Sequence, residues 1–460
     1  MNKTHTSWAK SLTNLAPRFL PFADAASDDL PLSRLLRLSL FQISVGMAMV
    51  MLVGTLNRVM IVELKVPASL VSLMVALPLL AAPFRALIGF KSDNHRSELG
   101  WRRVPYIWMG SLLLFGGFSI MPFALLVLSG AGQASEAPAW VGLFGAGGAF
   151  LLVGMGMHTV QTAGLALATD LAPPESQPKV VGLMYFMQLV GMMGSALMLG
   201  HLLEDYSHGQ LIRVVQAVAV MTLALNVAAL WKQEARSRLR KPGTPVEQNF
   251  SQAWQSFCQG PNTLRRLLAV GLGTMAFTME DVLLEPYGGE MLPLSVSTTT
   301  MLTATLALGG LLGFAWASRV LSKGGDAYRM ASWGAWMGVP AFVAVIVAPF
   351  WASPLLFALG IFGVGMGAGV FAHGTLTATM QIAPVEQTGL AMGAWGAVQA
   401  TAAGLGMALG GVMRDGVALL SNAFWGYSSV YLFEILLLAL TLWAMRPLIR
   451  RPDPAHSLSA

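Results

Sequence analysis

Charged side chains are scarce in this chain. Of its 460 residues, 28 are Lys or Arg and 22 are Asp or Glu, so that 11% are charged while 55% are hydrophobic. Soluble globular proteins carry about 25% charged residues, so most of this surface cannot face water. The composition excludes a soluble enzyme, a disordered chain and a nucleic-acid-binding protein, and it predicts an integral membrane protein.

Cysteine and catalytic motifs are scarce as well. A single cysteine, Cys258, excludes an internal disulfide framework and a cysteine-based metal cluster. The sequence contains no Gly-rich phosphate loop, no nucleophile elbow and no HExxH helix. We therefore expect no enzymatic activity, no metal site and no ATP-driven mechanism.

Long apolar runs dominate what is present. A membrane-spanning helix needs about 20 mostly apolar residues, and twelve runs of this kind occur. They cover residues 38–61, 68–90, 104–129, 140–169, 180–203, 211–231, 267–284, 297–320, 327–349, 354–381, 388–413 and 424–445. The sequence thus predicts twelve transmembrane helices.

The basic residues are distributed unequally between the two sides of these runs. If the N-terminus is cytoplasmic, 23 Lys and Arg residues lie on that side. The opposite side receives Arg58, Lys65, Arg213 and Arg414, and Arg85 falls within the second run. Basic residues accumulate in cytoplasmic loops, so we expect both termini to be cytoplasmic. No cleavable signal peptide is visible in the first 33 residues.

The longest polar stretch between runs divides the chain into two halves. Together with the apolar runs, this stretch predicts that the chain has five parts. They are a cytoplasmic N-terminal segment (1–37), a six-helix bundle (38–231), a cytoplasmic linker (232–266), a second six-helix bundle (267–445) and a cytoplasmic tail (446–460).

A shift of 211 residues aligns parts of the two halves without a gap. Ten of 47 positions are identical, among them the segment 154–156 on 365–367 and Glu175 on Glu386. We interpret these matches as a duplication. The predicted fold is therefore an all-α membrane protein with twelve helices in two parallel six-helix repeats, as in the major facilitator superfamily. The loop that runs from Gly89 through Asp93 to Arg102 and Arg103 resembles a loop motif of that superfamily; ordinary positive-inside charge is the alternative.

Three segments carry a closer resemblance. They are Gly54-Thr55-Leu56-Asn57-Arg58-Val59-Met60 with Glu63-Leu64, Pro83-Phe84-Arg85-Ala86-Leu87-Ile88-Gly89, and Trp101-Arg102-Arg103-Val104-Pro105-Tyr106. The chain resembles the PucC/LhaA light-harvesting-complex assembly family of purple phototrophic bacteria, the bacteriochlorophyll-delivery branch of that superfamily. The resemblance covers essentially the whole chain, and we favour the PucC-like branch.

This resemblance implies a function. Members of the family supply or fit bacteriochlorophyll to antenna polypeptides in the photosynthetic membrane and are linked to normal antenna expression. The implied cargo is bacteriochlorophyll a. The implied partners are light-harvesting antenna polypeptides and bacteriochlorophyll or its synthase, and the implied location is the inner, intracytoplasmic photosynthetic membrane. No nucleic acid is expected as a partner.

Candidate pigment or cavity residues lie in the fourth, fifth, tenth and eleventh runs. The magnesium of bacteriochlorophyll takes an axial ligand, and a neutral imidazole can serve. His373 aligns under the 211-residue shift with a position one helical turn from His158. With them we select Gln161, and Gln188 with its repeat equivalent Gln399. A buried histidine is more often a hydrogen-bond donor between helices, and that alternative stays open.

A second group of residues is assigned a structural or gating role. It comprises Arg58, Arg85, Asp93, Arg102, Arg103, Glu280 and Asp281. Arg85 could reach the cytoplasmic surface or pair with Asp93. We predict that Arg58 pairs with Glu280 or Asp281 of the second half, with Glu63 as an alternative partner. Such a pair would latch the two halves on the periplasmic side.

Two other functions compete with antenna assembly. A proton-coupled transporter normally needs an ionisable group in mid-membrane, and the central helices carry none except histidine. Glu434 lies in the twelfth run, which is usually peripheral. The scarcity disfavours a transporter of polar solutes. It leaves open a transporter of an apolar molecule and a pigment-free scaffold for antenna helices.

Overall fold

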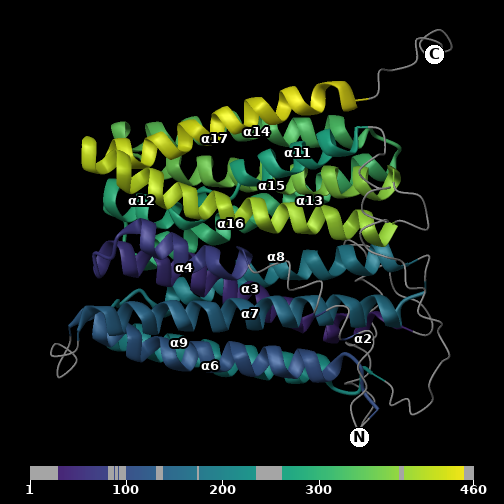
Figure 1. Cartoon of the computed structure of the whole chain (residues 1–460), viewed down its shortest axis with the longest axis horizontal. Helices are drawn as coiled ribbons and strands as arrows, with labels where there is room; N and C mark the ends of the chain where they lie inside the picture. The colour runs from purple at the N-terminus through teal and green to yellow at the C-terminus, as the bar shows by residue number, and fades with distance from the viewer. Residues whose placement is uncertain are drawn as a thin grey trace, which may run out of the picture.

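The chain folds into a bundle of long helices (Figure 1). The computed structural model describes residues 30–80, 88, 92, 100–130, 138–173, 176–234, 262–382 and 388–449, and these residues form helices and connecting turns. In this part of the chain, ten helices are long and apolar enough to cross a membrane, or eleven if one bent pair counts as a single span. The protein is therefore a multi-pass membrane protein, with fewer than the twelve predicted spans within the described residues.

The first half contains the elements up to Leu230. They are α2 (Leu32–Leu38), α3 (Leu40–Met49), η2 (Val50–Leu56), η3 (Val59–Glu63), α4 (Ala68–Leu80), α6 (Val104–Ser129), α7 (Ala139–Leu171), α8 (Gln177–Leu202) and α9 (His208–Leu230). The stretch from Leu32 to Glu63 is one candidate span, and α4 is the shorter apolar helix of the predicted second span.

The second half repeats this arrangement. Its elements are α11 (Thr263–Ala276), η5 (Glu280–Val282), α12 (Leu284–Met291), α13 (Val296–Ser322), α14 (Ala327–Val347), η6 (Ala348–Trp351), α15 (Pro354–Ile382), α16 (Thr388–Leu420), α17 (Ala423–Met445) and η8 (Arg446–Leu448). In Figure 1 the purple and blue helices of the first half lie below the green and yellow helices of the second.

The two ends of the bundle differ in what they hold. The start of α2 and the end of α17 lie at the right of Figure 1, which we call the termini end; the start of α4 and α12 lie at the opposite, far end. Several helices begin with a polar side chain that accepts a hydrogen bond from a backbone N–H of the first turn, which otherwise has no partner. These caps are Ser207, Ser295, Asp326 and Asn422.

Glycines bring neighbouring helices into backbone contact in both halves. A Cβ at Gly156 of α7 would lie 2.6 Å from the carbonyl oxygen of Gly110 of α6, and one at Gly367 of α15 would lie 2.8 Å from the carbonyl oxygen of Gly334 of α14. Gly156 and Gly367 are equivalent under the 211-residue shift. The third and fourth spans of each half thus pack through the same small-residue contact.

The first and seventh spans depart from regular α-helix. In the first span, α3 passes into the π-helical segments η2 and η3. The sequence predicted one unbroken seventh span over 267–284, but α11 ends at Ala276 and the chain bends by 44° before α12. The polar residues Thr278, Glu280 and Asp281 lie at this break. Irregular backbone at membrane depth is tolerated where protein surrounds it.

Candidate functional site

The two halves meet through polar contacts at the far end. Asn57 donates to the backbone carbonyl of Val282, and the Thr55 and Thr300 hydroxyls lie 3.3 Å apart. These contacts join the π-helical part of the first span to the break in the seventh span and to α13. The two irregular segments therefore face each other at the junction of the halves.

Arg58 pairs with the alternative partner that the sequence offers, Glu63, and not with Glu280 or Asp281. The Arg58 Nη1 atom lies 2.6 Å from Glu63 Oε1. Its Nη2 donates to the carbonyl oxygen of Leu294 at 3.1 Å. The predicted ion pair with Glu280 or Asp281 is wrong, because Glu63, five residues along the same span, occupies the guanidinium. The contact with Leu294 still ties Arg58 to the second half.

A second contact between the halves had not been predicted from the sequence. The carboxylate of Asp415, in α16, accepts a hydrogen bond at 2.7 Å from the backbone N–H of Ser69, in the first turn of α4. Arg414 fixes this carboxylate through an ion pair of 2.8 Å and also pairs with Glu290 at 2.9 Å. An anionic cap at a helix N-terminus is favourable because it meets free N–H groups and the positive end of the helix dipole. Asp415 thus caps a helix of the other half.

The termini end holds the Arg102 and Arg103 pair. Arg103 is 4% exposed; it donates to Asp170 at 3.0 Å and to Ser92, and Arg102 donates to the same Asp170 at 2.9 Å. Glu234 accepts hydrogen bonds from the backbone N–H groups at the start of α6. These contacts bind the entry to α6 to the ends of α7 and α9. The predicted residues Arg85 and Asp93 lie outside the described part of the chain.

Two of the predicted cavity residues are in contact. Gln161 of α7 donates to Gln188 of α8 at 2.9 Å, and Gln188 in turn lies 3.1 Å from the sulfur of Met49 in α3. His158 is 6% exposed and lies one turn before Gln161. The structure therefore places these polar groups of the fourth and fifth spans against the first span.

The second-half candidates occupy α15 and α16. The half-buried ring of His373 lies 4.2 Å, centroid to centroid, from the ring of Phe314. Its Nδ1 is buried without a hydrogen-bond partner, which leaves one ring nitrogen uncommitted to the protein. Gln399 is half-buried on α16. The chemistry of His373 fits an axial ligand for a macrocycle-bound magnesium.

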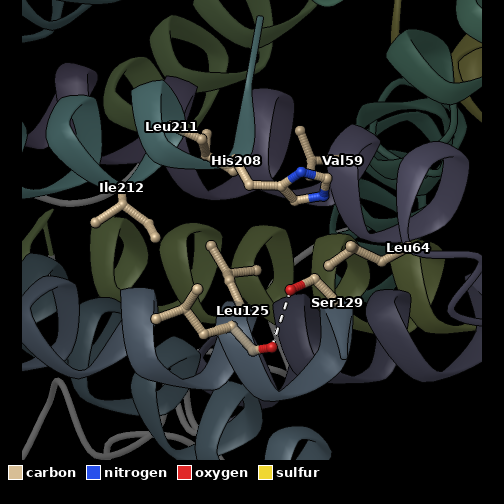
Figure 2. A pocket seen from close by; sticks show the side chains of 8 residues that line it. Val59, Leu64, Leu125, Ser129, His208, Leu211 and Ile212 are labelled. Atoms are coloured by element: carbon tan, nitrogen blue, oxygen red, sulfur yellow. Dashed lines mark hydrogen bonds between the residues drawn. The ribbon is translucent and has the colours of Figure 1, made fainter. Parts of the chain in front are cut away.

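A small apolar notch lies elsewhere, at the far end between η3, α6 and α9 (Figure 2). Val59, Leu64, Leu125 and Leu211 line it with His208, whose ring points between the aliphatic side chains. Beside it, in the loop before α9, burial raises the pKa of Tyr206 to about 12. This notch contains none of the predicted pigment candidates.

At the end of α8, His201 of the last turn and Glu204 of the following loop form an exposed contact of 2.9 Å. Among the described residues, no group of three or more His, Cys, Asp or Glu side chains has the geometry to hold a metal ion. Both side chains of the His201–Glu204 pair are exposed.

Two buried carboxyl groups, those of Glu285 and Glu434, are not among the candidate residues that the sequence indicates. Glu285 is 5% exposed and accepts hydrogen bonds from the hydroxyls of Thr303 and Thr300 in α13. The sequence predicts a peripheral helix for Glu434, but this residue is fully buried, as is Glu280. The sequence sign of a buried Glu434 is a single Glu inside an apolar run. For Glu285 the sign is the group of threonines at the start of the eighth span, whose hydroxyls donate to it.

Known structures with the same architecture define the class of this protein. The fold matches that of a bacterial homologue of the human lysosomal transporter Spinster, with a TM-score of 0.66 and 16% identity over 92% of this chain and 98% of that one. A bacterial homologue of the iron transporter ferroportin matches with a TM-score of 0.66 and 14% identity over 90% and 97%. The protein has the fold of major facilitator transporters.

The sequence comparisons identify its family. Residues 55–452 match the family described as PUCC protein, and the chain belongs to this family. It is 61% identical to Protein PucC of Rhodovulum sulfidophilum over 92% of this chain and 94% of the relative, and 56% identical to Protein PucC of Cereibacter sphaeroides over 98% and 99%. It is 26% identical to the bacteriochlorophyll synthase 44.5 kDa chain of Rhodobacter capsulatus over 83% and 87%.

Proposed function

We propose that this protein is an assembly factor for light-harvesting antenna complexes that binds bacteriochlorophyll and delivers it to antenna polypeptides. Membership of the PucC family over almost the whole chain is the observation that carries this proposal. In the proposed topology it lies in the inner, intracytoplasmic photosynthetic membrane with both termini cytoplasmic, which makes the far end periplasmic. Antenna polypeptides and the synthase that makes the pigment are the proposed partners.

The central helices support an apolar cargo. The middles of α7, α8, α13 and α15 contain no Asp, Glu, Lys or Arg. A flat, apolar macrocycle needs such a surface and one ligand to its magnesium, and His373 offers a ring nitrogen without a protein partner. Phe314 beside it offers an aromatic face. A buried ring nitrogen without a hydrogen bond costs free energy, and ligation of that nitrogen to the cargo's magnesium would recover part of this cost.

The fold favours one competing function. Transporters share this architecture, so export of an apolar small molecule is the second candidate. A scaffold that contacts antenna helices without holding pigment is the third. The three candidates differ in what stays bound to the purified protein.

Purification in a mild detergent from pigmented membranes distinguishes them. Stoichiometric bacteriochlorophyll absorbance on the protein is expected if it delivers pigment. Antenna polypeptide without pigment of its own would point to a scaffold, and the absence of both would favour transport.

A genetic test separates assembly from regulation. Deletion of the gene is expected to remove pigmented antenna while antenna transcripts stay unchanged. If the transcripts fall before the antenna is lost, regulation is primary and the assembly proposal is wrong.

A further inference from the structure

Two carboxyl groups lie together in the interior of the second half. Glu280 belongs to η5, at the break in the seventh span, and Glu434 lies in the middle of α17. Their side chains are 1% and 0% exposed. The two carboxyls interact electrostatically with each other and with that of Asp281.

Three of the four oxygens of these two carboxyls have no hydrogen bond of good geometry. Both side-chain oxygens of Glu434 and one of Glu280 are buried without a hydrogen bond of good geometry, although the backbone N–H of Glu280 lies near the Glu434 carboxyl. A buried acceptor without a partner costs about 1–3 kcal/mol, and more if it is charged. The pair therefore needs a hydrogen-bond donor that the surrounding side chains do not supply.

The surroundings of the pair are aromatic rather than basic. The Tyr431 ring lies 5.2 Å from that of Tyr287 and 6.3 Å from that of Phe342. Tyr431 interacts electrostatically with Glu434 and Glu280, and its hydroxyl is itself without a hydrogen bond. Phenol groups in this position cannot neutralise a carboxylate.

The basic residues on the helices that pack against α17 are engaged elsewhere. Arg265 of α11 donates to the carbonyl oxygens of Trp443 and Ala444, about ten residues and so about 15 Å along α17 from Glu434. On α16, Arg414 is held by Glu290 and Asp415. The other basic residues of these packed helices lie in the first turns at the termini end, Arg266 of α11 and Arg329 of α14.

Two adjacent carboxyl groups without a cation cannot both be ionised in a low-dielectric interior. One proton shared between them relieves the repulsion and gives an orphan oxygen a hydrogen bond. A metal ion would relieve it too, but the described residues contain no group with metal-holding geometry. We propose that Glu280 and Glu434 form a proton-binding site in which the Glu434 carboxyl holds a proton and donates it in a hydrogen bond to Glu280.

The site is connected to the junction of the two halves. Val282, two residues from Glu280 in the same short segment, accepts the hydrogen bond from Asn57 of the first span. Gain or loss of the proton therefore acts on the segment that joins the halves at the far end. The inference does not depend on the cargo, because neither Glu280 nor Glu434 is among the residues proposed to hold pigment.

Infrared spectroscopy of the purified full-length protein at neutral pH tests the site directly. Exposed carboxyl groups titrate near pH 4, so at neutral pH a carbonyl-stretch band of protonated carboxylic acid reports buried groups. We expect such a band in the wild type and its loss or strong reduction in Glu434→Gln. We expect its displacement in Glu280→Gln, which changes the group that accepts the hydrogen bond, and its retention in Glu204→Gln, which removes an exposed carboxyl.

The conservative change Glu434→Asp keeps a carboxyl and is expected to retain the band at a displaced frequency. This variant separates proton binding from a packing role, because a Gln variant that misfolded would lose the band for another reason. Absence of the band in the wild type would overturn the proposal. A band that is unchanged in both Gln variants would also overturn it, since the proton would then lie on another group such as Asp281 or Glu285.

Discussion

At the residue scale, the sequence indicated which charged residues make contacts within the bundle. It was less successful in predicting the partners of those contacts. Arg58 was selected because it lies near the end of an apolar span, and it does contact the second half. Its ion-pair partner is the alternative, Glu63. A carboxylate five residues away on the same span is closer to the guanidinium than one on another span. The contact between Asp415 and Ser69 could not have been predicted, since these residues are 346 positions apart and only the folded bundle brings them together.

Asp415 is expected to contribute to stability across the junction of the halves. Asp415→Ala removes the cap of α4 and should cost about 1 kcal/mol, seen as a lower melting temperature in detergent. Asp205→Ala, which removes an exposed loop carboxylate, is the matched control and should leave the melting temperature unchanged. Equal melting temperatures for both variants would show that the cross-half cap contributes nothing.

At the element scale, hydrophobic run length predicted most helices, but not where two of them become irregular. The π-helical segments of the first span and the 44° bend of the seventh lie where these spans contact each other and α13. Asn57 donates to the carbonyl of Val282, and Thr55 lies against Thr300. Run length averages over such segments, even where Thr278, Glu280 and Asp281 interrupt the seventh run, so run length alone could not reveal them.

The equivalent glycines make a prediction about helix packing. Gly156→Ala and Gly367→Ala each force a Cβ against a neighbouring backbone, and we expect each to cost about 1–3 kcal/mol. Gly148→Ala on the same helix as Gly156 meets no atom within 4 Å and is the control. The comparison is made by thermal unfolding in detergent, and tolerance of both packed variants would refute the small-residue contact.

At the scale of the whole molecule, twelve runs and an internal repeat were enough to predict an all-helical membrane fold of the major facilitator type. The same pattern selects the candidate residues but could not show their contacts, such as that of Gln161 with Gln188 or of His373 with Phe314, because these depend on how the helices pack. The orientation in the membrane rests on the distribution of basic residues and remains a prediction.

Labelling of single cysteines tests that orientation. In a background where Cys258 is replaced by Ser, Glu204→Cys places a thiol in an exposed far-end loop, and Lys323→Cys places one in an exposed loop at the termini end. A membrane-impermeant thiol reagent added to the periplasmic side should label the first variant and spare the second. Labelling in the reverse order would invert the proposed topology.

Pigment binding in the absence of antenna polypeptides is the most direct test of the account. The protein is purified in mild detergent from a pigment-producing strain without antenna genes, as the wild type, as His373→Leu, and as His201→Leu, which removes an exposed histidine. We predict stoichiometric bacteriochlorophyll absorbance in the wild type and in His201→Leu, and at least a tenfold loss, about 1.4 kcal/mol, in His373→Leu. A wild-type protein that is folded and free of pigment would contradict the proposed function.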